Sequence, residues 1–465
     1  MRVERDALGE RTVPEEVYWG IQTERAIENF RISGLRYPPE MARAIGAVKV
    51  AAAEANMRLA ALDPAVGRPI LQAAREVLEG RFDDQFPLDV FQAGAGTSLN
   101  MNANEVIANR ALELIGEPKG SYDKIGPNDD ANMSQSTNDT IPTALRIAAL
   151  WKLERDLYPA VERLTEALES KAREFDDMVT AGRTHLQDAV PIRLGQRFGG
   201  YAEAVRRASD AVRAAAAELH RVNLGATAVG TGINTPPGYQ DTVVPVLAQL
   251  TGLPLRPADN LFEITQSAAD FGRASSALRL LALELIRIAN DLRLLSSGPR
   301  TGLREIVLPA VQPGSSIMPG KVNPSIPEMV DMVGFQVVGN DETIALAVQA
   351  GQLDLNVMLP VIAHNLLHSI HILSTASRAF ADRCVVGITA DRERARKYAE
   401  SSEALVTILS PHIGYLTAAE IGKESVATGR TIREIVLERG LMSAEKLDEL
   451  LDSYAMTRPK AKDRG

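Results

Sequence analysis

Long runs of leucine-type residues with helical spacing limit this chain to a helical architecture. Within residues 264–297 apolar side chains recur at alternating intervals of three and four, at Leu278, Leu281, Leu285, Ile288, Leu292 and Leu295. This spacing is typical of a helix that packs against other helices. It predicts one helix of 34 residues, which is about 51 Å long at the usual helical rise. Because a stripe of this length cannot be buried in a compact single subunit, we expect an elongated helical bundle that continues into other subunits of a homo-oligomer.

Other segments with helical spacing surround this stripe, and the fold class is therefore mainly α. We expect three domains: residues 1–135, mixed and mostly helical; residues 136–391, a long-helix bundle; and residues 392–465, small and helical. Besides 264–297, helices are expected near residues 40–62, 68–79, 101–115, 138–177, 193–223, 327–350 and 354–384. Pro159 should kink the helix in which it lies. The charged tail from Lys460 to Arg464 should be disordered.

Composition and charge exclude several classes of function. The net charge is −9 at pH 7, which provides no basic surface for nucleic acid. The single cysteine, Cys384, cannot form an intramolecular disulfide or a multi-cysteine zinc site. The sequence lacks an apolar run of about 20 residues, the length of a transmembrane helix, and its charged N-terminus does not resemble a signal peptide. We therefore expect a soluble cytoplasmic protein that binds neither nucleic acid nor membrane.

Four loops interrupt the helical segments and contain most of the unusual polar residues. They are residues 94–100 (GAGTSLN), 134–139 (SQSTND), 182–188 (GRTHLQD) and 314–324 (GSSIMPGKVNP). The last loop superficially resembles a phosphate-binding loop, but five residues separate its glycines and Val322 stands where a magnesium-binding Ser or Thr is required. We reject a nucleotide site and consider a mobile loop that brings a serine, an ammonium and an amide to a small anion. An ordinary Gly/Pro surface loop explains the same residues equally well.

The other loops have structural explanations as well as functional ones. Thr137 or Asn138 can cap the helix that follows residues 134–139, and a helix N-terminus with several hydroxyls also binds carboxylates. The glycines of residues 94–100 let the backbone approach a ligand, or they simply form a turn. His185 is either a satisfied surface histidine or a hydrogen-bond donor and proton carrier.

Two further patterns do not support a cofactor. His364, His368 and His371 share one helix face, which makes a metal site imaginable. No Cys, Asp or Glu joins them within that segment, so a helix face packed against other helices is the better interpretation. The glycines of residues 225–232 do not form a dinucleotide fingerprint, because no strand or βαβ pattern accompanies them. We expect neither a metal nor a cofactor.

Taken together, the loops match one known pattern. The most specific motif is GSSIMPGKVNP at 314–324, supported by NMNANEVIANRALEL at 100–114, SQSTND at 134–139, GRTHLQDAVP at 182–191 and GATAVGTGIN at 225–234. With these motifs the chain resembles the fumarase/aspartase superfamily over nearly its whole length. The resemblance implies a mostly helical three-domain protomer whose long central helices assemble a homotetramer. It also implies active sites that are each built from loops of three subunits.

The resemblance further implies a reaction and a general base. Ser315 would remove a proton from the carbon next to the β-carboxylate of L-aspartate, and ammonia would leave to give fumarate. The intermediate is a dianionic aci-carboxylate, which needs several hydrogen-bond donors around it. Because a neutral serine is a poor base, its alkoxide would need stabilisation by backbone N–H groups and by Lys321.

The same motifs imply which residues bind the substrate carboxylates. Thr97, Ser136 and Thr137 match the family positions that donate hydrogen bonds to the intermediate. Lys321 and Asn323 match the positions that hold the α-carboxylate.

Four more residues match supporting positions of the family. Thr184 and His185 would lie near the α-carboxylate, and Asn138 and His185 would orient the amino group. Glu328 matches a carboxylate that pairs with the active-site histidine in fumarases.

Fumarate hydratase is the close alternative, because it shares the base and the product. Three features favour the ammonia-lyase: Ser98-Leu99 after Gly96-Thr97, the sequence Ser136-Thr137-Asn138, and GQLDLNVM at residues 351–358. Gly126 also replaces a histidine that is common in fumarases at a secondary anion site. A non-catalytic structural protein on the same scaffold is the remote alternative, and retention of the base and of the lysine of residues 314–324 argues against it.

Overall fold

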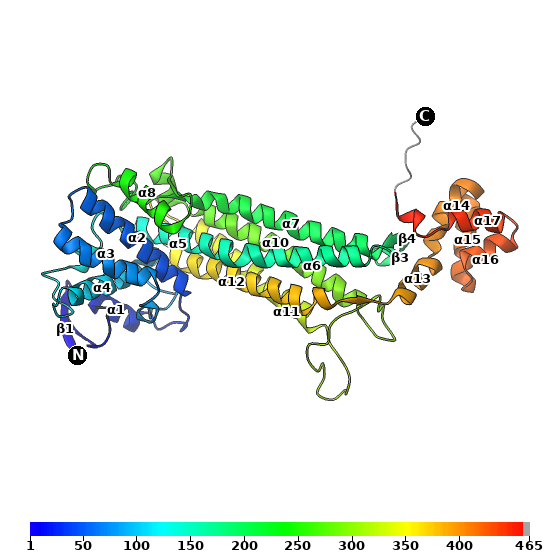
Figure 1. Cartoon of the computed structure of the whole chain (residues 1–465), viewed down its shortest axis with the longest axis horizontal. Coiled ribbons are helices and arrows are strands. Elements are labelled where there is room, and N and C mark those ends of the chain that lie inside the picture. The colour runs from blue at the N-terminus through cyan, green and yellow to red at the C-terminus, as the bar shows by residue number, and fades with distance from the viewer. Residues whose placement is uncertain (459–465) are drawn as a thin grey trace. The chain divides into compact units, whose positions relative to one another are not determined.

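The computed structural model describes residues 1–458, in which the chain is mainly α-helical, with 17 α-helices and eight short strands, as expected (Figure 1). The described chain divides into two compact units. Unit 1 comprises Met1–Pro159, Ala208–Ala282 and Gly334–Ser374. Unit 2 comprises Ala160–Arg207, Leu283–Val333 and the described residues from Thr375 onward.

Unit 1 contains the shorter N-terminal helices. In chain order these are α1 (Ile21–Asn29), α2 (Pro39–Arg58), α3 (Pro64–Leu78), α4 (Thr97–Leu114), α5 (Thr137–Lys152), α8 (Tyr239–Thr251) and α9 (Leu261–Gln266). The helix starts follow the local sequence. Pro39 and Pro64 each occupy the first helical position, and Asp63 caps α3 by accepting the N–H of Ala65 at 2.8 Å. An antiparallel hairpin, β1 (Arg2–Asp6) and β2 (Gly9–Val13), precedes α1.

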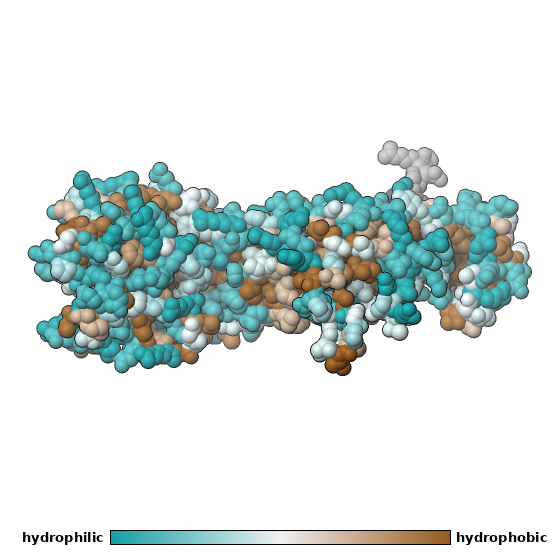
Figure 2. All heavy atoms as spheres, turned by 60° about the horizontal axis from the view of Figure 1, so that its bottom comes forward, coloured by the Kyte–Doolittle hydropathy of each residue, from teal (hydrophilic) through white to brown (hydrophobic). Residues whose placement is uncertain are grey.

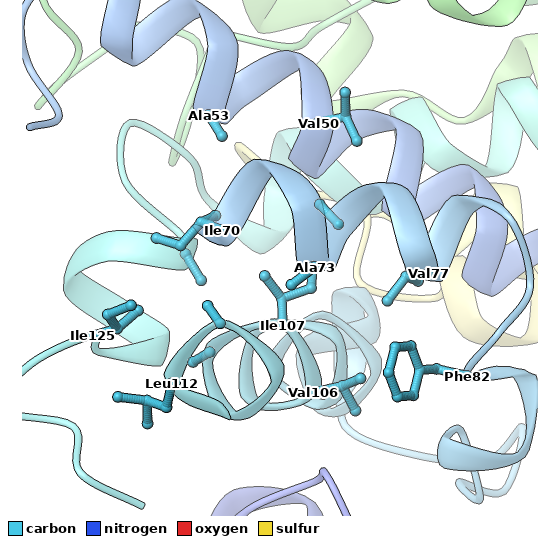
Figure 3. Close-up of a cluster of buried hydrophobic side chains, with 14 residues drawn as sticks. Val50, Ala53, Ile70, Ala73, Val77, Phe82, Val106, Ile107, Leu112 and Ile125 are labelled. Atoms are coloured by element: carbon cyan, nitrogen blue, oxygen red, sulfur yellow. The ribbon is translucent and has the colours of Figure 1, made fainter. Parts of the chain in front are cut away.

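An apolar cluster between α2, α3 and α4 forms part of the core of unit 1 (Figure 3). Its members labelled in the figure are Val50, Ala53, Ile70, Ala73, Val77, Phe82, Val106, Ile107, Leu112 and Ile125. Of these, Val106, Ile107 and Leu112 belong to α4, and Ile70, Ala73 and Val77 belong to α3. Burial of one helix face against two neighbours fixes α4 in place, and with it the polar loop from which α4 begins.

Five long helices contribute residues to both units. They are α6 (Tyr158–Glu174), α7 (Leu194–Ala216), α10 (Ala269–Leu295), α11 (Ser325–Gln349) and α12 (Leu359–Arg383). Together with α5 they cover the long helices expected from the sequence. A π-helical turn at Leu153–Leu157 joins α5 to α6 immediately before Pro159. The expected disturbance at this proline therefore takes the form of a widened turn, which accommodates a residue that has no N–H.

Two expectations about the leucine stripe are wrong. The predicted 34-residue helix is interrupted, because Ser267 is extended and its Oγ accepts the N–H of Ala269 at 3.3 Å, so that α10 starts afresh with 27 residues. In addition, the stripe residues from Leu278 to Leu295 are all buried within the single chain. The stripe itself therefore does not require another subunit, because neighbouring helices of the same chain cover it.

Unit 2 carries two of the four candidate loops, residues 182–188 and 314–324, and the C-terminal helices. The helices confined to it are α13 (Arg392–Ser401), α14 (Val406–Ile413), α15 (Tyr415–Thr428), α16 (Ile432–Glu438) and α17 (Ala444–Leu450). An apolar cluster that includes Leu409, Ile421 and Ile435 holds the C-terminal helices together, so the short helices expected here are confirmed. The charged tail from Lys460 to Arg464 lies outside the described residues, and the division into three domains stays a prediction.

The remaining strands are short ribbons. In unit 2, β3 (Val179–Thr184) and β4 (Gln187–Arg193) form an antiparallel hairpin, and β7 (Ile306–Val307) pairs with β8 (Thr389–Ala390). In unit 1, β5 (Arg221–Val222) pairs with β6 (Arg256–Pro257). Across residues 1–458, no helix combines the length and the apolarity needed to span a bilayer.

Candidate active site

The loop at residues 314–324 is closed at its base by its own polar groups. The N–H of Gly314 donates to the carbonyl of Lys321 at 2.8 Å, and Asn323 Nδ2 donates to the carbonyl of Gly314 at 2.6 Å. A Cβ on Gly314 would lie 2.5 Å from the Lys321 carbonyl oxygen. Only glycine permits this close approach, so the motif requires it for the shape of the loop.

The hydroxyl of Ser315 accepts two backbone hydrogen bonds. The N–H of Ile317 donates to Ser315 Oγ at 3.3 Å and the N–H of Met318 donates to it at 3.1 Å. Both donors point at one oxygen and stabilise negative charge on it. Ile317 and Met318 are exposed by 83% and 48%, and Figure 2 shows the apolar tip of a loop that projects into solvent. The loop therefore presents a serine with a preorganised pair of donors.

A pocket of about 310 Å³ lies beside the base of this loop in unit 2. Arg304, Lys321 and Asn323 are among its lining residues. Two cationic side chains and an amide on one concave surface suit a small anion. Glu328 follows in the first turn of α11, where its N–H donates to the carbonyl of Pro324 at 3.1 Å.

Thr184 and His185 lie on the tip of the β3–β4 hairpin. Thr184 pairs with Gln187, so His185 and Leu186 form a two-residue turn. Their φ angles are 55° and 60°, in the left-handed region that such turns require and that glycine or asparagine usually fills. Neither residue is glycine, so the turn that presents His185 is strained.

A buried carboxylate anchors this hairpin. Glu305 is fully buried and accepts hydrogen bonds from Thr180 Oγ1 at 2.9 Å, from Arg197 Nη1 at 3.3 Å and from Arg183 Nη1. Arg183 lies directly before Thr184 in β3. The strained turn is therefore attached to the core of unit 2 by a charge-assisted network.

In unit 1, two helix N-termini open beside each other. Thr97 begins α4 and Thr137 begins α5. A Cβ on Gly96 would lie 3.0 Å from Ile141 Cγ2, so the turn before α4 lies directly on α5. Asn100 Nδ2 of α4 donates to Thr137 Oγ1 of α5 at 3.2 Å, so the two helix starts lie close together. Because a helix N-terminus carries the positive end of its dipole, this corner favours an anion.

The start of α5 is capped by Ser136. Ser136 Oγ accepts the N–H of Asn138 at 3.2 Å, and Asp139 Oδ1 accepts the N–H of Ser136 at 3.0 Å, which completes a capping box. Asn138 Nδ2 donates to the carbonyl of Ala228 at 2.8 Å. The loop therefore does cap α5, but the cap is Ser136, and the expectation that Thr137 or Asn138 caps this helix is wrong. Thr137 is the first helical residue, so its side chain is available for another role.

Sequence reasoning missed a polar network buried behind Thr137. Lys49 Nζ donates to Asn132 Oδ1 at 3.0 Å, and Asn100 Nδ2 bridges Asn132 Oδ1 and Thr137 Oγ1 at 3.2 Å each. Burial lowers the pKa of Lys49 to about 7, although the charge of Asp139 opposes this shift. Burial also raises the pKa of Asp139 to about 6. The available signal was the motif NMNAN, because asparagines are uncommon in a buried helix face.

The predicted site residues fall into two groups. Thr97, Ser136, Thr137 and Asn138 belong to unit 1, and Thr184, His185, Ser315, Lys321, Asn323 and Glu328 belong to unit 2. Within unit 1 the corner between α4 and α5 brings its group together. Within unit 2 the serine, the lysine and the asparagine share one loop. In the part of the chain that the structure describes, no hydrogen bond or ion pair joins the hairpin tip to that loop.

The histidine face of α12 does not form a metal site. The rings of His364 and His368 stack with their centroids 5.7 Å apart, and Asn340 Nδ2 lies 3.3 Å from His368 Nδ1. Burial lowers the pKa of both histidines. Among the 458 described residues, no group of three or more His, Cys, Asp or Glu side chains is placed to hold a metal ion.

Comparison with known proteins gives one consistent result. A family model described as Lyase matches residues 9–339, and one described as Fumarase C C-terminus matches residues 405–458. The chain is 50% identical to an aspartate ammonia-lyase of a Bacillus species, over 99% of this chain and 98% of that protein. It is 47% identical to a class II fumarate hydratase of Thermosynechococcus vestitus, over 96% of each. A fumarate lyase:delta crystallin structure from Brucella melitensis, bound to cobalt, matches with a TM-score of 0.96 and 49% identity, covering 98% of this chain and 100% of that one.

Proposed function

The chain belongs to the fumarase/aspartase family of lyases, and from this premise we propose that it is an aspartate ammonia-lyase. It converts L-aspartate reversibly into fumarate and ammonia. The observation that carries the general base, which both candidate reactions share, is the pair of backbone N–H groups on Ser315 Oγ. The alternative is a class II fumarate hydratase, which uses the same base to convert L-malate into fumarate and water.

Ser315 is the general base in this proposal. A serine alkoxide is a strong base that is costly to form in water, and a hydrogen bond to a charged group contributes about 1.5–3 kcal/mol. The N–H groups of Ile317 and Met318 already bond to the neutral hydroxyl and bond more strongly to the alkoxide, so the difference lowers the cost of ionising Ser315. The alkoxide then removes the proton next to the β-carboxylate, and the electron pair moves into that carboxylate to give the aci-carboxylate.

The corner between α4 and α5 supplies the donors for that developing charge. Thr97, Ser136 and Thr137 surround two helix N-termini, where fixed N–H groups and dipoles need no reorganisation during the reaction. Lys321 and Asn323 hold the α-carboxylate, with Thr184 nearby.

Two side chains orient the leaving group in this proposal. Asn138 and His185 face the amino group, and His185 is held in place by the strained hairpin turn. Glu328 supports the histidine, as its counterpart does in fumarases. The elimination then needs the ammonia to depart opposite the electron pair left by the abstracted proton.

The site is completed by other subunits of a homotetramer, as the family pattern implies. Support comes from α11, where Met332, Phe335 and Leu346 are each more than 60% exposed. Phe335 follows Met332 by three positions and Leu346 follows Phe335 by eleven, so all three lie on one helix face. Exposed large apolar residues on one face indicate a covering partner. The proposed three domains, 1–135, 136–391 and 392–465, are the building blocks of this assembly.

The preference for aspartate over malate is supported by one contact as well as by the relatives. The N–H of Ala95 donates to the carbonyl of Val357 at 2.7 Å, so the segment 351–358 lies directly behind the turn that presents Thr97. Differences between ammonia-lyases and hydratases in this segment thus reach the proposed carboxylate site. Two ammonia-lyases from Bacillus are 50% identical to the chain, whereas those of Corynebacterium glutamicum and Escherichia coli are 47% identical, as are the hydratases. The identities therefore favour the ammonia-lyase by a small margin.

One experiment tests the proposal. The purified chain is incubated separately with L-aspartate and with L-malate, and fumarate is followed by its ultraviolet absorbance. Fumarate from aspartate supports the ammonia-lyase. Fumarate from malate alone makes the chain a hydratase, and no product from any dicarboxylate favours the non-catalytic scaffold.

A further inference from the structure

Lys49 is a buried ammonium for which the fold gives no compensating contact with a carboxylate. Its side chain is 1% exposed, and its hydrogen-bond partner is a neutral amide oxygen, Asn132 Oδ1, at 3.0 Å. Within residues 1–458 it takes part in no ion pair. Burial of an unpaired charge is costly, and an apolar side chain of similar size would pack here more favourably. This cost indicates a role other than folding.

The hydrogen bonds that lead away from Lys49 have a fixed direction. An ammonium can only donate, so the Asn132 oxygen faces it. The same oxygen accepts from Asn100 Nδ2 and from Asn104 Nδ2, each at 3.2 Å. Asn132 Nδ2 in turn donates to the carbonyl of Gln135 at 3.2 Å. These contacts set the orientation of both the Asn132 and the Asn100 amides.

The chain of donors ends on Thr137. Asn100 Nδ2 also donates to Thr137 Oγ1 at 3.2 Å. Since a hydroxyl that accepts a hydrogen bond keeps its own hydrogen free, the Thr137 O–H is left as a donor. Thr137 is half-buried at the corner between the two helix N-termini, where a carboxylate would accept that hydrogen.

We propose that Lys49 is a positioning residue for the dicarboxylate: through Asn132 and Asn100 it holds the Thr137 hydroxyl as a hydrogen-bond donor to the substrate. The inference rests on the proposed function, in which Thr137 contacts the carboxylate that gains charge. It adds a residue that lies behind the site and touches no substrate.

Asp139 does not cancel the charge of Lys49 by contact. Its carboxylate is occupied by three backbone N–H groups, those of Ser136 at 3.0 Å, Gly225 at 3.0 Å and Thr227 at 2.9 Å. Asp139 is the charged group whose field acts on the pKa of Lys49. When Lys49 is protonated, its positive charge therefore also favours a dianion at the corner that Thr137 borders.

A double-mutant cycle tests the inference. Lys49→Met keeps the length of the side chain and removes the donor, and Thr137→Val removes the hydroxyl at the end of the relay. We expect Lys49→Met alone to lower kcat/KM about 10- to 100-fold, which is less than the roughly 100- to 1000-fold cost of losing a transition-state donor outright, because the Thr137 hydroxyl is still present. In the Thr137→Val background the same change should cost less than about 3-fold, because coupled residues are not additive. Lys152→Met is the matched control, since Lys152 is a buried lysine of the same unit outside this relay, and it should change kcat/KM less than about 2-fold.

The outcomes are distinguishable. If the wild-type chain turns over no dicarboxylate, the proposed function fails and this inference fails with it. If the wild type is active and the effects of Lys49→Met and Thr137→Val simply multiply, the inference alone is overturned. Should Lys49→Met not fold, Asn132→Leu breaks the relay one step later and must show the same non-additivity with Thr137→Val. Thermal unfolding of each variant separates loss of donor orientation from loss of structure.

Discussion

Replacement of Glu305 by glutamine tests how the hairpin tip is held. Glu305 is fully buried and binds Thr180, Arg183 and Arg197. Glutamine has the same length but no charge, and its NH2 group meets guanidinium N–H groups that need an acceptor. Two arginine cations thus lose their buried counter-charge while the packing volume is preserved.

The expected magnitude follows from burial. Removal of one partner from a buried ion pair costs about 3–5 kcal/mol, and because glutamine keeps one acceptor oxygen we expect a loss near 3 kcal/mol. The turn at His185 and Leu186 holds two residues at positive φ, each of which costs about 1–3 kcal/mol. A strained turn that loses its anchor should relax first, which moves His185. A displacement of about 1 Å at a catalytic group can cost about 100-fold in rate, so turnover should fall at least 10-fold.

The assay combines urea unfolding with fumarate production. Glu203→Gln is the matched control, because Glu203 lies in the same unit, is exposed and pairs with Arg206 on the surface. An exposed pair contributes about 0.2–1 kcal/mol, so the control should change unfolding and turnover little. If Glu305→Gln unfolds at the wild-type urea concentration and turns over at the wild-type rate, Glu305 does not anchor the hairpin and the reasoning is refuted.

Further predictions concern the loops and the buried lysine. Ser315→Ala should abolish turnover without changing the oligomeric state seen by size-exclusion chromatography, and full activity would eliminate the proposed base. Lys321→Ala should raise KM strongly through loss of a charge-assisted contact, and an unchanged KM would contradict its role. Leu186→Gly should stabilise unit 2 by up to about 1 kcal/mol, since glycine adopts positive φ without strain, whereas a lower melting temperature would exclude strain there. Burial lowers the pKa of Lys49 to about 7 in the folded chain, so above that pH the unfolded chain binds more protons than the folded chain. The free energy of unfolding should therefore rise from pH 7 towards pH 10. Lys49→Met should weaken this rise, and an unaltered slope would argue against the pKa shift of Lys49.

Periodicity predicted most of the helices but not where they are buried. The stripe that contains Leu278 and Leu285 is covered by the same chain, whereas the sequence suggested that it needed another subunit. Periodicity reports that one face is apolar and does not identify its partner. The better indication of a partner is the exposed apolar face of α11 with Met332 and Phe335, which only the structure separates from buried faces.

Helix breaks were harder to predict than helices. Ser267 is a good capping residue, yet nothing in the spacing around it separates a cap from a polar residue in a continuous helix. The π-turn at Leu153–Leu157 lies before Pro159, because the residues on the N-terminal side of a proline lose the hydrogen bond. Breaks of this kind depend on how the backbone shares its hydrogen bonds after packing, which a residue pattern does not contain.

The motifs located the loops of the candidate site, and the structure adds what holds them. Ser315 and His185 stand out in the sequence because their loops are rich in glycine and polar residues. The structure adds Glu305, which anchors the hairpin at His185, and Lys49, which lies behind Thr137. Each lies far in the sequence from the segment that it supports. A sequence does not show whether a charged side chain is buried. A lysine on the surface is common, and the same lysine becomes a functional candidate only when the structure shows that it is buried.

The two buried supports differ in a way that bears on function. Glu305 is surrounded by cations and a hydroxyl, so its burial is compensated by contacts that also stabilise the fold. Lys49 has a neutral amide as its partner, so its burial remains uncompensated until an anion occupies the corner at Thr137. Replacement by an apolar residue should therefore destabilise the fold at Glu305 and leave it stable at Lys49, although both replacements should impair turnover. That contrast would distinguish Glu305, which stabilises the fold, from Lys49, which serves the bound dianion.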